Sequence, residues 1–320
     1  MTLIAKHPNA KGAHPRSKRV KTVSMLPSLF TLGNLLCGFA AIYFAMRATF
    51  DVGAGVSSSQ ALTLSSERWE RLLPSFLSVG AGLVLLGMVF DMFDGVVARM
   101  TKSTTSFGGQ LDSMADMVTS GVAPMTLMLA FMMKELKAVD ISLSPLSEHF
   151  FGRFAWVSAV VFVACAAVRL ARFNVEHART DHDHNVFRGL PSPGAAGVVA
   201  ALLICVEQAQ LVGMGLGGRL FLYAMPGVAL VAGLLMVSPI RYYKIGALLR
   251  GRRPFGQLII VIFLFAIFWV AKSVALTVLA LGYTLSGPVM MLARRSRAGG
   301  KTARSGAGDL AINDETKQTG

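Results

Sequence analysis

Four aspartates stand in two closely spaced pairs, Asp91 with Asp94 and Asp112 with Asp116, between long apolar stretches. On an α-helix, side chains three or four residues apart share a face, so each pair presents both carboxylates in one direction. About seven residues, 100–106, join the two helices. We therefore expect antiparallel neighbours whose acidic pairs converge at one end.

Converging carboxylates near lipid repel one another and lose hydration unless cations neutralise them. Oxygen ligands without histidine or cysteine suit Mg²⁺, Mn²⁺ or Ca²⁺, and four aspartates can bracket two such ions. Paired cations suit chemistry on phosphate, where they stabilise the charge on the leaving oxygen. Small residues beside the acids, Gly95, Ala98 and Gly108, leave room for a bulky ligand or for close helix packing. Arg99 adds a permanent cation for a phosphate group.

Two other interpretations compete with a metal site. The aspartates can be solvated residues at the ends of membrane helices, although acids paired at these spacings among small residues are unusual there. They can also form a cation or proton pathway through a transporter, which predicts carboxylates nearer the middle of a span.

The composition indicates an integral membrane protein. Of the 320 residues, 53% are hydrophobic and only 15% are charged, against about 25% charged in soluble domains. The formal net charge of +14 therefore points to anionic lipid and inward-facing loops, not to nucleic acid. The three cysteines lie in apolar runs without paired spacing, so neither a disulfide framework nor a cysteine metal site is expected.

Apolar runs long enough to approach a membrane span predict an all-α, polytopic membrane helix bundle. There are eight candidates: 29–46, 72–90, 117–133, 154–168, 189–206, 220–240, 254–271 and 273–292. The second is expected to continue to about residue 100 and the third to begin near 107. Only Lys272 separates the last two, so seven spans remain an alternative.

The distribution of lysine and arginine predicts the orientation. With eight spans, 23 of these residues fall in the tails and loops on the side of the acidic pairs, and 8 on the other side. The excess places both tails and the acidic end in the cytoplasm, as expected for a protein of the cell inner membrane. The predicted divisions are a basic cytoplasmic tail over 1–23, a transmembrane catalytic domain over 24–293 and a disordered cytoplasmic tail over 294–320.

The acidic segment resembles the signature of the CDP-alcohol phosphatidyltransferase family, D-x2-D-G-x2-A-R-x8-G-x3-D-x3-D. All eight fixed positions match: Asp91, Asp94, Gly95, Ala98, Arg99, Gly108, Asp112 and Asp116. Three further stretches resemble the bacterial phosphatidylserine synthase branch. They are L-P-S-L-F-T-L-G-N-L-L-C-G (26–38), V-R-L-A-R-F-N-V (168–175) and F-R-G-L-P-S-P-G-A-A-G (187–197). Ser28 stands where that branch usually has asparagine.

The resemblance implies transfer of a phosphatidyl group from CDP-diacylglycerol to L-serine, with release of CMP. It also implies a divalent metal pair, Mg²⁺ or Mn²⁺, on Asp91, Asp94, Asp112 and Asp116, with Asp116 also as catalytic base. Gly95, Ala98, Arg99 and Gly108 are then expected to bind CDP-diacylglycerol. The expected partners are the two substrates, membrane lipids and a second copy of the chain in a homodimer, without nucleic acid. Other acceptor alcohols, such as glycerol phosphate or inositol phosphate, remain alternatives, as does an ion-coupled transporter.

Three polar features outside the acidic segment have competing interpretations. Asn34, inside the first span, either lines the CDP-diacylglycerol site or makes a helix-helix hydrogen bond. Arg169 and Arg172 either bind serine or phosphate or extend to lipid headgroups. The loop D-H-D-H-N over 181–185 looks superficially like a metal cluster, but alternating short polar residues in a loop are usually solvated.

Overall fold

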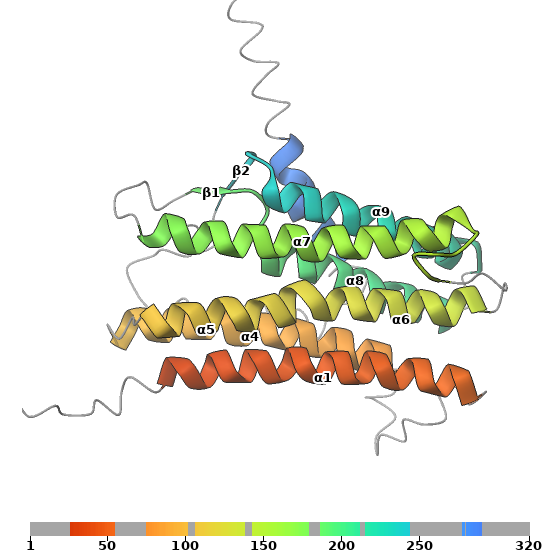
Figure 1. Cartoon of the computed structure of the whole chain (residues 1–320), viewed down its shortest axis with the longest axis horizontal. Helices are drawn as coiled ribbons and strands as arrows, with labels where there is room; N and C mark the ends of the chain where they lie inside the picture. Colours follow the sequence, from red (N-terminus) through yellow and green to blue (C-terminus); the bar gives the residue numbers. More distant parts are fainter. Residues whose placement is uncertain are drawn as a thin grey trace, which may run out of the picture.

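The protein is a bundle of long helices lying roughly side by side (Figure 1). The computed structural model describes residues 26–54, 75–101, 106–137, 143–178, 186–211, 215–243, 277–278 and 280–289. Its helices are α1 (Leu26–Ala54), α4 (Phe76–Thr101), α5 (Ser106–Asp116), α6 (Ala123–Lys137), α7 (Phe150–Ala178), α8 (Ser192–Leu211) and α9 (Gly215–Val237). A π-helical segment, η2 (Met117–Val122), joins α5 to α6, so the three form one continuous rod.

Six helical stretches are long and apolar enough to cross a membrane: Ser28–Phe50, Phe76–Val97, Phe107–Leu136, Phe150–Val175, Ser192–Ala209 and Leu220–Val237. They correspond to the first six predicted spans and confirm the helical membrane bundle. The predicted extension of the second to about residue 100 and the start of the third near 107 are confirmed by α4 and α5. The seventh candidate, 254–271, lies outside the described residues. In the eighth, the described positions 277–278 and 280–289 are helical, so the predicted total of eight spans remains a prediction.

A short antiparallel pair of strands departs from the purely α-helical prediction. Strand β1 (Val186–Arg188) pairs with β2 (Arg241–Tyr243), bringing together the segments before α8 and after α9. Gly189 follows β1 with φ 81°, a conformation that glycine adopts without steric cost, and its amide donates to the carbonyl of Ile240 at 2.8 Å. This pairing was not expected, because three-residue strands produce no measurable hydrophobic alternation.

Helix α4 packs antiparallel to both α1 and the α5–η2–α6 rod. Phe76, at the start of α4, stacks on Phe44 late in α1, whereas Phe93 near its end stacks on Phe30. A Cβ at Gly87 would approach Asn34 of α1 and Thr119 of η2 together. The predicted antiparallel arrangement of the two acid-bearing helices is therefore confirmed.

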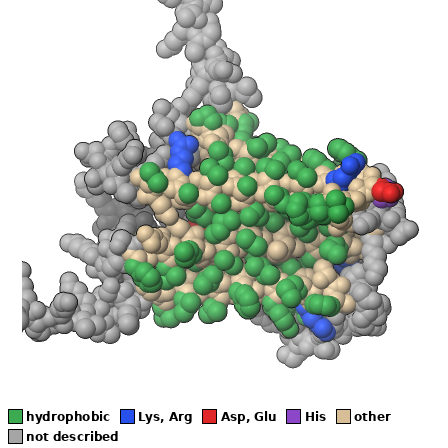
Figure 2. Space-filling model, in the orientation of Figure 1, with side chains coloured by type: hydrophobic (Ala, Val, Ile, Leu, Met, Phe, Trp, Pro, Cys, Tyr) green, Lys and Arg blue, Asp and Glu red, His purple; other side chains and the backbone are tan. Residues whose placement is uncertain are grey.

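The outer surface of the bundle suits a lipid environment. Hydrophobic side chains cover most of the face in Figure 2, and the basic side chains lie near its ends. On α1, large apolar side chains such as Leu36, Phe39 and Phe50 are more than half exposed. Alanine, methionine and leucine side chains of α6, α8 and α9 instead fill the interior. Because water would disfavour so much exposed apolar surface, the bundle is built for a bilayer.

Candidate metal centre

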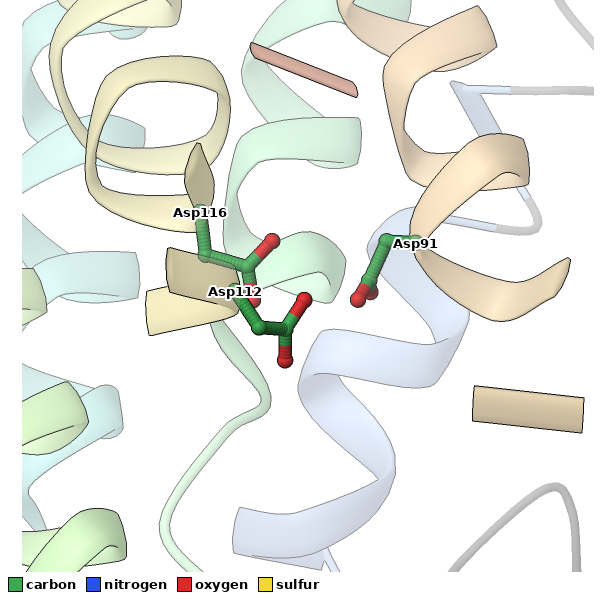
Figure 3. Close-up of side chains that lie close together, drawn as sticks. All are labelled: Asp91, Asp112 and Asp116. Atoms are coloured by element: carbon green, nitrogen blue, oxygen red, sulfur yellow. The ribbon is translucent and has the colours of Figure 1, made fainter. Parts of the chain in front are cut away.

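Three of the predicted acids converge in the structure. Asp91 comes from α4, and Asp112 and Asp116 come from successive turns of α5. Their carboxylate groups point toward one another (Figure 3), and one oxygen from each lies within 4.8 Å of the others. The antiparallel packing of α4 against the rod creates this arrangement, since residues near the end of one helix meet those near the start of the other.

Asp94 lies beside this group, one turn after Asp91 on α4. Its side chain is buried, and its charge interacts with those of Asp91 and Asp112. Its Oδ2 also accepts a hydrogen bond from the hydroxyl of Thr31. The structure therefore brings together all four aspartates that the sequence singles out.

The donor set fits hard divalent cations. The four side chains offer only carboxylate oxygens, the preferred ligands of Mg²⁺ and Mn²⁺. Asp112 Oδ1 is buried and accepts no hydrogen bond within the described part of the chain. A buried carboxylate oxygen without a donor is costly, and a bound cation would satisfy it.

The acids lie toward one end of the bundle. Asp91 and Asp94 fall in the last third of the span Phe76–Val97, and Asp112 and Asp116 fall in the first third of Phe107–Leu136. This placement differs from the mid-span carboxylates that a transport pathway predicts. It favours a ligand that approaches from the membrane surface.

Helix α1 supplies two hydrogen-bond donors to the acids. Thr31 donates to Asp94, and Asn34 Nδ2 donates to Asp116 Oδ1 at 3.0 Å. The Asn34 interaction is the helix-helix hydrogen bond that the sequence left as one of two alternatives. Sequence reasoning missed Thr31, although it lies three residues before Asn34 on the same helical face.

The rod widens immediately after Asp116. The six-residue π-helix η2 buries Thr119, Ser120 and Gly121, and such segments often occur at functional sites. A Cβ at Gly38 of α1 would lie 2.9 Å from the Cα of Thr119, closer than ordinary contacts permit. Glycine at this position therefore allows α1 to pack directly against η2.

For the other predicted site residues, the structure gives positions on the helices but no contacts with a ligand. Gly95 lies on α4 beside Asp94, and Gly108 lies one turn before Asp112 on α5. Ala98 and Arg99 belong to the last turns of α4, but their side chains are outside the described part. Their predicted binding roles stay predictions.

Arg169 joins the site from α7. Its Nη1 donates to Ser192 Oγ at 3.0 Å, at the start of α8, and its charge interacts with that of Asp116. Arg172 is exposed further along α7, so its binding role stays a prediction. The loop 181–185 lies outside the described residues.

The sequence is similar to a known protein family and to individual relatives. The family model of the CDP-alcohol phosphatidyltransferases matches residues 24–237. Three relatives are named CDP-diacylglycerol–serine O-phosphatidyltransferase. The one from Helicobacter pylori J99 is 29% identical over 223 residues, 70% of this chain and 73% of the relative. The one from Methanocaldococcus jannaschii is 34% identical over 162 residues, 51% of this chain and 62% of the relative. The one from Bacillus subtilis is 26% identical over 200 residues, 62% of this chain and 86% of the relative.

The family match includes both acid-bearing helices, α1 and the Arg169 region of α7. It covers about two thirds of the chain. The convergence of the signature aspartates is independent support from the structure. This chain belongs to the CDP-alcohol phosphatidyltransferase family.

Proposed function

We propose that the protein transfers the phosphatidyl group of CDP-diacylglycerol to the hydroxyl of L-serine, giving phosphatidylserine and CMP. Family membership supports the phosphatidyl transfer, and the names of the curated relatives support serine as acceptor. The observation that carries the chemistry is the meeting of three carboxylates from α4 and α5 within 4.8 Å.

The four aspartates would hold two divalent cations, Mg²⁺ or Mn²⁺. When bound, the cations supply positive charge that stabilises the diphosphate as it breaks. The protein orients the ligands: Asp91 and Asp94 from α4 face Asp112 and Asp116 from α5.

Asp116 is the proposed catalytic base. The serine hydroxyl gives its proton to this carboxylate as its oxygen attacks the β-phosphorus of CDP-diacylglycerol. A new phosphorus-oxygen bond forms, the bond to the bridging diphosphate oxygen breaks, and CMP leaves with that oxygen.

The remaining predicted residues serve binding. Gly95 and Gly108, beside the acids, would let the CDP-diacylglycerol headgroup approach the backbone, with Ala98 and Arg99 in the next turn of α4. Arg169 would attract the carboxylate of serine or a phosphate oxygen, and its attraction to Asp116 supports a place beside the reacting groups. Arg172 is proposed as a second cation for the same ligands.

We also propose that the acidic end faces the cytoplasm in the cell inner membrane, with tails 1–23 and 294–320 flanking the catalytic domain 24–293 on that side. The lysine and arginine distribution supports this orientation. A homodimer is proposed as the assembly, to be tested by the mass of the purified protein in detergent.

Labelling of introduced cysteines with an impermeant reagent in intact cells tests the orientation. A cysteine near Lys102 should be protected until the cells are opened, whereas one near Lys137 should react at once. Labelling near Lys102 in intact cells would reverse the assignment.

The decisive experiment for the reaction measures CMP release by the purified protein from CDP-diacylglycerol with a panel of acceptors. Serine should give rapid release and a phosphatidylserine product, while glycerol phosphate and inositol phosphate should not. If another alcohol is preferred, the proposed phosphatidyl transfer stands, but serine is not the acceptor. Solute uptake into vesicles without CMP release would instead identify a transporter.

A further inference from the structure

Helix α1 presents two buried polar side chains, Thr31 and Asn34, to the acidic cluster. They lie three residues apart and are 3% and 1% exposed, respectively. Thr31 donates to Asp94 of α4, and Asn34 donates to Asp116 of α5. One face of α1 therefore contacts an acid from each side of the cluster.

Asn34 is held within the helix interface. Its backbone carbonyl accepts a hydrogen bond from Thr119 Oγ1 at 2.9 Å. Its side-chain Oδ1 faces α4, where a Cβ at Gly87 would lie 2.9 Å away. The amide of Asn34 thus lies where α1 meets α4 and η2, and its nitrogen faces the carboxylate of Asp116. Only this orientation lets the amide donate, because its oxygen can only accept.

Each hydrogen bond occupies a single carboxylate oxygen. Thr31 contacts Asp94 Oδ2 and Asn34 contacts Asp116 Oδ1, so each acid keeps its second oxygen for another ligand. Without these donors, repulsion from the neighbouring acids would favour rotation of the side chains away from the cluster. Hydrogen bonds to metal-binding carboxylates hold the ligands in their binding orientation.

We propose that Thr31 and Asn34 are positioning residues that hold Asp94 and Asp116 ready for divalent cations, and that Asn34 is not a nucleotide ligand. This inference rests on the proposed function, because it assumes that the four aspartates bind the metal. It assigns α1 the task of fixing the relative positions of the acids on α4 and α5.

The first test compares Thr31→Val with Thr31→Ser in the purified full chain. Valine has nearly the shape of threonine but cannot donate, whereas serine retains the hydroxyl. Titration with Mn²⁺, followed by electron paramagnetic resonance, should give roughly 10- to 100-fold weaker binding for Thr31→Val and near-normal binding for Thr31→Ser.

Thr126→Val is the matched control. Thr126 lies on α6, and its hydroxyl donates to the carbonyl of Ala123 at 2.8 Å, within its own helix. This variant makes the same chemical change away from the acids, so its Mn²⁺ affinity should equal that of the unmodified protein.

Asn34→Ala tests the second donor. This test remains informative even if the Thr31 variants do not fold. A positioning role predicts weaker Mn²⁺ binding and a lower kcat, with the KM for CDP-diacylglycerol nearly unchanged when Mn²⁺ is saturating. A direct nucleotide contact predicts the opposite, a raised KM with unchanged Mn²⁺ affinity, and this result would overturn the proposal.

Two outcomes separate this inference from the proposed function. If the unmodified protein binds Mn²⁺ but does not release CMP from CDP-diacylglycerol, the proposed reaction fails while the affinities of the variants still test the positioning role. If Thr31→Val and Asn34→Ala both bind Mn²⁺ as tightly as the unmodified protein, the positioning role is wrong whatever the reaction. Absence of Mn²⁺ binding by the unmodified protein would overturn both.

Discussion

Two buried polar clusters occupy opposite ends of the bundle. The acidic cluster comprises Asp91, Asp94, Asp112 and Asp116. The second, here the Glu207 cluster, comprises Glu207 of α8, Ser75, Ser78 and Lys134. Along α4, Ser78 and Asp91 are thirteen residues apart, a separation of about 20 Å at the α-helical rise.

The Glu207 cluster is compensated within the protein. The side chain of Glu207 is 3% exposed and accepts hydrogen bonds from the hydroxyls of Ser75 and Ser78. Lys134 Nζ lies 3.7 Å from its Oε1 and balances the charge. Hydrogen bonds and an opposite charge are the usual conditions for burying a carboxylate.

The negative charge of the acidic cluster is less well compensated by neighbouring side chains. Two uncharged groups donate hydrogen bonds to it, the hydroxyl of Thr31 and the amide of Asn34. Among the described residues, Arg169 interacts with Asp116, and one arginine does not balance four carboxylates. Buried acids therefore occur in two settings here: the Glu207 cluster joins helices, whereas the acidic cluster could bind external cations.

The largest expected effect is on activity, from Asp112→Asn. Removal of a charged ligand should lower CMP release by more than the roughly 100-fold typical for loss of a supporting partner. The protein should still fold, since asparagine has a similar volume and one source of repulsion is removed. Glu135→Gln is the control, because it removes one negative charge from α6 outside the acidic cluster, and its activity should be normal. Near-normal activity of Asp112→Asn after dialysis against a chelator would contradict the two-cation proposal.

A smaller effect, on thermal stability, is expected when Mn²⁺ is added to chelator-treated protein. A ligand at 100 times its Kd stabilises the folded state by about 2.7 kcal/mol, so the thermal midpoint in detergent should rise by several degrees. The rise should persist in Glu207→Gln and be much smaller in Asp112→Asn. An equal rise in both variants would place the Mn²⁺ site outside the acidic cluster.

The smallest effect, again on thermal stability, is expected from Lys134→Met. Loss of one partner from a fully buried ion pair costs about 3–5 kcal/mol. Because Lys134 is 28% exposed and therefore partly screened by its surroundings, a cost of about 1–3 kcal/mol is expected. The thermal midpoint should fall by a few degrees, Lys134→Arg should restore it, and kcat should remain normal. A large loss of kcat in Lys134→Met at a temperature where it is folded would show that the two clusters are coupled.

Sequence reasoning was strongest where a short segment contains the whole pattern. Spacings of three and four residues place carboxylates on one helical face, and a short connection makes α4 and α5 neighbours. The convergence of Asp91, Asp112 and Asp116 could therefore be predicted. The first six spans could be predicted for a similar reason, because a bilayer imposes a minimum length of apolar sequence.

Contacts between distant segments required the tertiary structure. Thr31 and Asp94 are 63 residues apart, and Ser78 and Glu207 are 129 apart. Helical periodicity determines which face a side chain occupies, but not which neighbouring helix lies against that face. For Asn34, the sequence therefore left two roles open, lining the CDP-diacylglycerol site or bonding to another helix. The packing of α1 against the rod determined its hydrogen bond to Asp116.

The sequence by itself determined the membrane-embedded helices, the paired acids and their preference for hard cations, because these follow from residue type and local spacing. Tertiary structure decided the π-helical segment after Asp116, the strand pair β1–β2 and the distribution of hydrogen-bond donors to the acids. The physical reason is that each of these depends on how closely separate helices approach. At Gly38 and Gly87, absence of a side chain allows an approach that no local pattern specifies.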